Sequence, residues 1–223
     1  MKMPKLAMSA MLVLSVLIVG GRRADAGLIA NGGFETGDLT GWSVNDSSLT
    51  SAEFSVAQLG GGGTYFPPTP DSGDYFAYLL SGIDVNIPTV LYQDFTASAG
   101  SVLSFDIFFD TAEEGPDRQN DFGAAILQGA TTGSAILFFA DVEMVGDLGT
   151  TGWVHISYTI LNDDSYSLGF LVLNSGDNDT FFNSALGVDN VSLAVPEPSS
   201  LAMSGVALCL WAGRRLRRRK TAV

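Results

Sequence analysis

Val102-Leu103-Ser104-Phe105-Asp106-Ile107-Phe108-Phe109-Asp110 is the stretch that decides the fold of this chain of 223 residues. Every second residue from Leu103 to Phe109 is apolar, whereas Ser104 and Asp106 lie between them. Successive side chains of a β-strand point to opposite faces. The alternation therefore predicts a strand with one face in a core and the other toward solvent.

The same two-residue period recurs along the middle of the chain. It is clearest in Trp153–Ile160, Tyr166–Val172 and Val188–Leu193. Further strands are expected at Glu53–Gln58, Tyr75–Leu80, Leu91–Thr96, Phe122–Leu127 and Ala135–Val142. Clusters of Gly, Asp, Asn and Ser separate them, and no segment there combines a sustained helical period with caps. The expected fold class is all-β, an antiparallel β-sandwich or jelly roll.

The charge of this middle region is strongly one-sided. Residues 27–195 hold 22 of the 24 acidic residues but only one of the 11 basic residues, Arg118, so their formal charge is about −21. Binding to nucleic acid is excluded, because it requires several cations to neutralise phosphates. Anionic membranes and acidic polysaccharides are disfavoured unless divalent cations bridge the two surfaces.

The first 26 residues have the order of a secretory signal peptide. Lys2 and Lys5 form the positively charged n-region. The apolar run Leu6–Val19 that follows is shorter than the roughly 20 residues that span a bilayer. Ala24-Asp25-Ala26 supplies the small residues of a cleavage site. A buried N-terminal helix is the alternative. The pattern favours export and removal of residues 1–26.

The C-terminal end, residues 195–223, has a second ordered pattern. Pro196-Glu197-Pro198 fixes an extended backbone, because proline locks φ and lacks an N–H. Leu201–Gly213 is a short apolar helix candidate, and Arg214–Lys220 places six positive charges in seven positions after it. A basic cluster behind an apolar helix stops translocation on the cytoplasmic side.

These three parts resemble the PEP-CTERM sorting signal of Gram-negative bacteria. The resemblance implies transient inner-membrane anchoring through residues 201–213. It also implies cutting near Pro196, Glu197 and Pro198 by an exosortase, a membrane cysteine peptidase. The expected location is then the cell surface or the extracellular matrix. An ordinary membrane anchor with a chance Pro-Glu-Pro is the alternative interpretation.

A second resemblance covers nearly all of residues 27–194. It rests on five short motifs, Asn31–Trp42, Asp71–Ala77, Leu91–Phe95, Ala99–Phe105 and Gly187–Leu193. In this order they are similar to the galactose-binding-like jelly roll of many carbohydrate-binding modules. The resemblance implies that Phe34 and Trp42 plug one end of the sandwich, with a sugar-stacking Trp42 as the alternative. Gln93, between Tyr92 and Phe95, is expected to cap a loop.

Members of that fold often carry one structural calcium ion near the chain ends. Calcium takes about six to eight oxygen ligands from carboxylates, carbonyls and water. The matching positions are Glu35, Asp74 and Asp189, and the alternative is that each is a turn or surface carboxylate. The acidic stretch Asp110–Asp121 lacks the residue order of an EF-hand loop.

The sequence offers few catalytic groups. His155 is the single histidine, expected on the solvent face of a strand, and Cys209 in the sorting helix is the single cysteine. No Gly-x-Ser-x-Gly elbow, multi-His zinc set or phosphate loop occurs. The acids are too numerous for any one pair to indicate a glycosidase.

Three functions remain. The first is a non-catalytic surface or matrix protein processed by an exosortase. The second is a carbohydrate-binding module acting on extracellular polysaccharide, for which Tyr65 and Phe66 would be stacking candidates. A secreted hydrolase is the third. The prediction is therefore of a protein that is not an enzyme, with polysaccharide as a possible partner.

Overall fold

The computed structural model describes residues 29–45, 54–58, 71–81, 85–176 and 183–195. The signal peptide 1–26, the sorting segment from Pro196 onward, and Tyr65 and Phe66 lie outside these residues. Among the described residues, no helix is long and apolar enough to cross a membrane.

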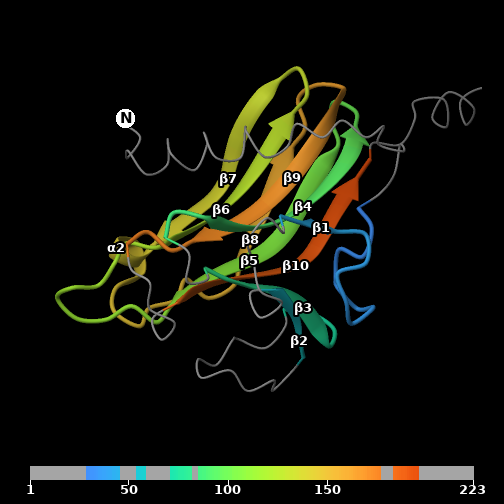
Figure 1. Ribbon diagram of the computed structural model, residues 1–223. Helices are drawn as coiled ribbons and strands as arrows, with labels where there is room; N and C mark the ends of the chain where they lie inside the picture. The colour runs from blue at the N-terminus through green and yellow to red at the C-terminus, as the bar shows by residue number, and fades with distance from the viewer. Residues whose placement is uncertain (1–28, 46–53, 59–70, 82–84, 177–182, 196–223) are drawn as a thin grey trace, which may run out of the picture.

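The described chain folds into two antiparallel sheets, which confirms the predicted β-sandwich (Figure 1). In sheet A the order is β1 (Ser43–Val44), β4 (Pro88–Ala97), β9 (Asp164–Leu173), β6 (Phe122–Gly129) and β7 (Gly133–Asp141). In sheet B the order is β2 (Phe54–Gln58), β3 (Tyr75–Leu80), β10 (Ser184–Ala194), β5 (Val102–Thr111) and β8 (Val154–Thr159). The turn between β6 and β7 lies at one end of the sandwich, and α2 (Val142–Val145) lies at the other (Figure 1).

The core lies between the inner faces of the two sheets. Phe105 of β5 packs edge-on against Phe170 of β9, with ring centroids 5.1 Å apart. The alternation seen in the sequence places these side chains, since every second residue of each strand enters the core. Both rings are fully buried and belong to one cluster that joins the two sheets.

The segment before β1 closes one side of the core. Phe34 is fully buried and Trp42 is 8% exposed, and their rings lie 5.4 Å apart. Trp42 Nε1 donates to the Asn31 carbonyl at 3.1 Å. Trp42 is therefore a core residue, which agrees with the expectation that Phe34 and Trp42 plug one end of the sandwich.

Gln93 ties this segment to sheet A. Its Oε1 accepts from Ala30 N at 2.7 Å, and its Nε2 donates to the carbonyl oxygens of Ala30 and Gly41 at 3.0 and 2.9 Å. The expectation that Gln93 caps a loop is confirmed. The buried amide satisfies backbone groups that no strand partner reaches.

At the α2 end, buried acids organise the loops. Asp141 caps α2 by accepting from Met144 N at 2.9 Å, and Asp121 accepts from Ser175 N at 2.9 Å. Glu113 accepts from Gln119 N at 2.8 Å. These contacts give the acids of this end structural roles. Their number explains why the acidic stretch after β5 stays folded without an EF-hand.

Candidate functional site

Glu35 holds the loop that precedes β3. Its Oε1 accepts from Asp74 N and Tyr75 N, each at 3.1 Å, and its Oε2 lies 3.2 Å from Asp74 N. Gly73 makes this approach possible. A Cβ at Gly73 would lie 2.1 Å from Glu35 Oε1, and the φ of +64° favours glycine.

Asp189 is a fully buried carboxylate on β10 beside the same loop. Its Oδ2 accepts from Ser72 N at 3.2 Å, and its Oδ1 accepts from Asn190 N at 2.7 Å. Burial raises the pKa of Asp189 to about 6, with further rises from the nearby charges of Glu35 and Asp106, against the lowering by the two backbone N–H groups. A carboxylate in this position is therefore harder to ionise than one in water.

The structure brings Glu35 and Asp189 together at the start of the domain. A Cβ at Gly33 would lie 3.8 Å from Glu35 Cγ and 4.0 Å from Asp189 Oδ1. Asp74, the third expected ligand, meets Glu35 through its main-chain N–H. Among the residues that the structure describes, no three His, Cys, Asp or Glu side chains are grouped to hold a metal ion. The calcium site stays a prediction.

Glu35 and Asp189 have carboxylate side chains, the kind of ligand that a hard cation takes, and their oxygens accept backbone N–H groups in this structure. Arg118 is the one Lys or Arg in residues 27–195, and it pairs with Asp147, which follows α2. Among the described residues, the carboxylates of Glu35 and the buried Asp189 therefore have no basic side chain beside them. A divalent ion with oxygen ligands would neutralise their charges.

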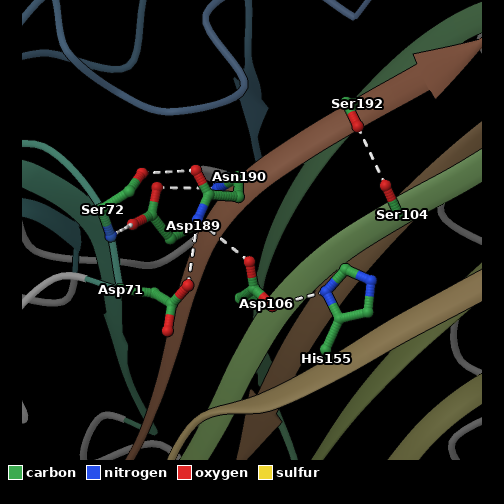
Figure 2. Close-up of polar contacts among 8 residues, drawn as sticks. All are labelled: Asp71, Ser72, Ser104, Asp106, His155, Asp189, Asn190 and Ser192. Carbon is green, nitrogen blue, oxygen red and sulfur yellow. Dashed lines mark hydrogen bonds and ion pairs between the residues drawn. The ribbon is translucent and has the colours of Figure 1, made fainter.

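A polar network that no sequence pattern predicts links this loop to sheet B (Figure 2). Asn190 Nδ2 donates to Asp106 Oδ2 at 3.0 Å and lies 3.3 Å from Asp71 Oδ2, while Asn190 Oδ1 accepts from Ser72 Oγ at 2.6 Å. Asn190 has a φ of +53°, next to a shift in the β10–β5 register. Asparagine tolerates this left-handed conformation better than most residues.

His155 joins the network from β8, on the outer side of sheet B. Its Nδ1 lies 2.7 Å from Asp106 Oδ1, and its side chain is 65% exposed, as the sequence predicted for a solvent-facing strand residue. Among the hydrogen bonds between described residues, none joins a serine or threonine hydroxyl to this ring. An acid that orients a histidine is one part of a catalytic triad, but no described nucleophile is bonded to the ring. The contact between His155 and Asp106 links β8 to β5.

The outer face of sheet A carries a different kind of surface. Cross-strand neighbours on β4, β9, β6 and β7 form rows on this face. The polar row is Asp94, Ser167, Gln128 and Ser134. The next two rows are Tyr92, Gly169, Ile126 and Ile136, and then Val90, Leu171, Ala124 and Phe139.

The apolar strip on this face is a second cluster, separate from the core between the sheets. It consists of Val90, Phe122, Ala124, Ile126, Leu171 and Leu173, with Tyr92, Ile136 and Phe139 packed against them. The rings of Phe122 and Phe139 stack at 5.7 Å. Its six central residues are buried, at 0 to 6% exposed, whereas Tyr92, Ile136 and Phe139 are partly exposed. The accessible part of this strip therefore lies at those three side chains.

Ser167, in the middle of the polar row, has an unmet hydrogen-bonding group. It is 4% exposed, and its Oγ has no hydrogen-bond partner among the described residues. On one side lies the exposed Asp94, and on the other lies Gln128, whose Oε1 accepts from Ser134 Oγ. A buried hydroxyl normally bonds to protein or to an ordered water. Thr89 and Ser101 also have buried hydroxyls without a partner in the described part of the chain, but of the three only Ser167 lies in the polar row of this face.

Comparisons with known proteins give likenesses of fold only. No family model and no curated protein matches the sequence. A carbohydrate-binding module, TmCBM61 in complex with β-1,4-galactotriose, aligns with a TM-score of 0.47 at 13% identity over 75% of this chain and 97% of that one. The K3 adhesin domain of Lys-gingipain from Porphyromonas gingivalis aligns at 0.43 and 14% identity, over 75% and 99%. The CBM22-1 xylan-binding domain from Paenibacillus barcinonensis Xyn10C aligns at 0.37 and 9% identity, over 78% and 97%.

Proposed function

We propose that this β-sandwich is a non-catalytic carbohydrate-binding domain, and that the outer face of sheet A holds the saccharide. Sugar rings present apolar C–H faces and a rim of hydroxyl groups. The partly exposed side chains of the apolar strip, Tyr92, Ile136 and Phe139, would cover the C–H faces, with Tyr92 and Phe139 supplying flat rings. The polar row would bond the hydroxyls.

The unpartnered hydroxyl of Ser167 is the observation that carries this proposal. Leaving a buried polar group unpaired costs about 1 to 3 kcal/mol, which a sugar hydroxyl would recover. Asp94 and Gln128 flank Ser167 at neighbouring strand positions, so one sugar unit could reach all three side chains. The sequence resemblance to carbohydrate-binding modules agrees with this role.

The charge of the domain selects the class of saccharide. Its formal charge of about −21 repels uronic acids and sulfated sugars. Arg118 pairs with Asp147 close to α2, and Asp94 adds a negative charge to the binding face itself. The expected ligand is therefore a neutral polysaccharide.

A glycan array tests this function directly. Purified protein should bind immobilised neutral polysaccharides such as xylan, galactan or β-glucan, and should not bind alginate or polygalacturonate in the absence of divalent cations. Binding to none of the neutral glycans would contradict the proposal. Preferential binding to the acidic glycans would contradict the proposed ligand class.

Export and sorting form the second part of the proposal. The order of Lys2, Leu6–Val19 and Ala24–Ala26 supports removal of a signal peptide. Pro196–Pro198 and the basic cluster Arg214–Lys220 support processing by an exosortase at the inner membrane. The domain would then act at the cell surface or in the extracellular matrix, where polysaccharide is its natural partner.

We also retain calcium as a proposed structural ion. Glu35 and Asp189 would supply the carboxylates, and the loop Ser72–Asp74 lies beside both through its N–H groups. The ion would supply positive charge that screens the two acids from each other and fixes the first segment of the domain to β10.

A further inference from the structure

A small cavity opens at the end of the sandwich that carries the β6–β7 turn. Its volume is about 160 Å³, and its lining combines Tyr158, Tyr166, Leu161 and Asn162 from β8, β9 and the connection between them with Thr132 and Ser134 from the β6–β7 hairpin. Pockets that enclose drug-sized ligands begin at about 300 Å³. This cavity therefore suits one sugar ring, not an oligosaccharide.

The cavity and the polar row of the outer face share one residue, Ser134. Ser134 lines it and is also the last member of that row, where its Oγ donates to Gln128 Oε1. A chain that follows the row across sheet A would arrive at the cavity after crossing β7.

The lining has the chemistry of a sugar site. Leu161 is 71% exposed although it is a large apolar residue, and Tyr158 beside it is partly exposed. These two side chains offer apolar surface to a ring. The Asn162 amide offers donors and an acceptor, and the hydroxyls of Ser134 and Thr132, whose hydrogens bond Gln128 and Asp164, offer acceptors. Among the described residues, nothing lies within 4 Å of where a Cβ of Gly133 would lie, so the cavity has access on that side.

The walls of the cavity are held in place before any ligand binds. Asp164 accepts from the backbone N–H groups of Thr131 and Thr132 at 2.9 and 3.2 Å and from their hydroxyls at 3.0 and 3.1 Å. Tyr166 Oη donates to the Asn162 carbonyl at 2.8 Å. A preformed site loses less conformational entropy on binding than a flexible one.

We propose that this cavity binds the terminal residue of a neutral saccharide chain, so that the protein recognises chain ends in addition to chain surfaces. This inference rests on the proposed carbohydrate-binding function. The ionised Asp164 beside the turn argues against an acidic terminal sugar, because its N–H bonds hold the pKa of its carboxyl below the ordinary value.

The test compares variants of the full-length protein against two sizes of probe. The probes are neutral hexasaccharides of β-linked xylose, galactose and glucose in calorimetry, and the long parent polysaccharides, whose chain ends are rare, in affinity electrophoresis. Leu161→Asp and Asn162→Ala alter exposed lining residues. Met144→Asp, on α2 at the other end and also at an exposed apolar residue, is the matched control.

Leu161→Asp and Asn162→Ala should each weaken binding of the preferred hexasaccharide by at least about tenfold and leave binding to the long polysaccharide unchanged. Met144→Asp should change neither. If Leu161→Asp and Asn162→Ala bind the hexasaccharide as tightly as the wild type, while Tyr92→Ala does not bind it, the cavity is not a subsite. The sheet face alone would then bind the saccharide. Equal loss on both probes would overturn end recognition, and absence of binding by the wild type would overturn both proposals.

Discussion

Ser167 and Gln128 are cross-strand partners on β9 and β6, on the face of sheet A that points away from the core. Gln128 is satisfied by Ser134 and by the Gly129 carbonyl, whereas the Ser167 hydroxyl has no partner among the described residues. Ser167 is therefore the residue of the polar row whose side chain has an unused hydrogen-bonding group.

Calcium should stabilise the domain beyond its effect as a screening ion. If Glu35 and Asp189 hold the ion, a concentration of about one hundred times the dissociation constant should add about 2.7 kcal/mol to the free energy of unfolding. Thermal melts with calcium and with sodium chloride of equal ionic strength would measure it. Asp189→Asn should lose most of the gain, whereas Asp117→Asn, in an exposed loop, should keep it. Equal responses from the two variants would mean that calcium acts only as a diffuse counterion.

Gln93→Ala should destabilise the fold by about 2 to 4 kcal/mol, because it leaves the Ala30 N–H and two carbonyl groups without partners. Urea unfolding followed by tryptophan fluorescence would measure the loss, since Trp42 lies in the same segment. Gln119→Ala removes one bond to the Asp117 carbonyl in an exposed loop and is the control. A loss as small as that of the control would show that the first segment is not held through Gln93.

Asp110 gives the stability of the domain a pH dependence. Burial raises its pKa from 3.8 to about 6, partly offset by a hydrogen bond from Thr111 N. The folded state therefore prefers the protonated acid. This contribution is fully present below pH 3.8 and is lost as the pH rises through about 6.

Asp110→Asn keeps a neutral side chain at every pH. Its melting temperature should match that of the wild type below pH 3.8 and exceed it above pH 6. Melting curves over this range would show the divergence. A constant difference between the two proteins across the range would refute the raised pKa.

Much of the fold could be predicted from the sequence, because nine strands show either alternation or apolar runs bounded by turn residues. Strand β5 begins at Val102 as expected and runs one residue past Asp110. The sequence missed β1, which is two residues long, and α2, which is a single turn. Elements this short have no period to detect.

The candidate sites were predicted only in part. Glu35 and Asp189 came from the resemblance, and the structure places them together. The outer face of sheet A was missed, because Phe122–Leu127 is apolar on both faces and so has no alternation. The bond between Asp106 and His155 depends on the register of β5 against β8, which no local pattern specifies.

Processing should shorten the chain at both ends. Protein recovered outside the cell is expected to begin near Gly27 and to lack the residues beyond about Ser200, and intact-mass measurement would show both cuts. Replacing Pro196 and Pro198 with Ala should leave uncleaved precursor in the membrane fraction, because the extended backbone before the sorting helix loses its rigidity. Surface protein that retains Arg214–Lys220 would contradict exosortase processing.

The central claim is that the outer face of sheet A binds neutral polysaccharide. The most direct measurement is the affinity of Tyr92→Ala and Ser167→Ala for the best ligand of the glycan array. Ser104→Ala, which removes the bond to Ser192 on the outer face of sheet B, is the matched control. We expect each variant on sheet A to bind at least about tenfold more weakly, with Ser104→Ala equal to the wild type. Unchanged affinity in both sheet A variants, with their folds intact, would contradict the claim.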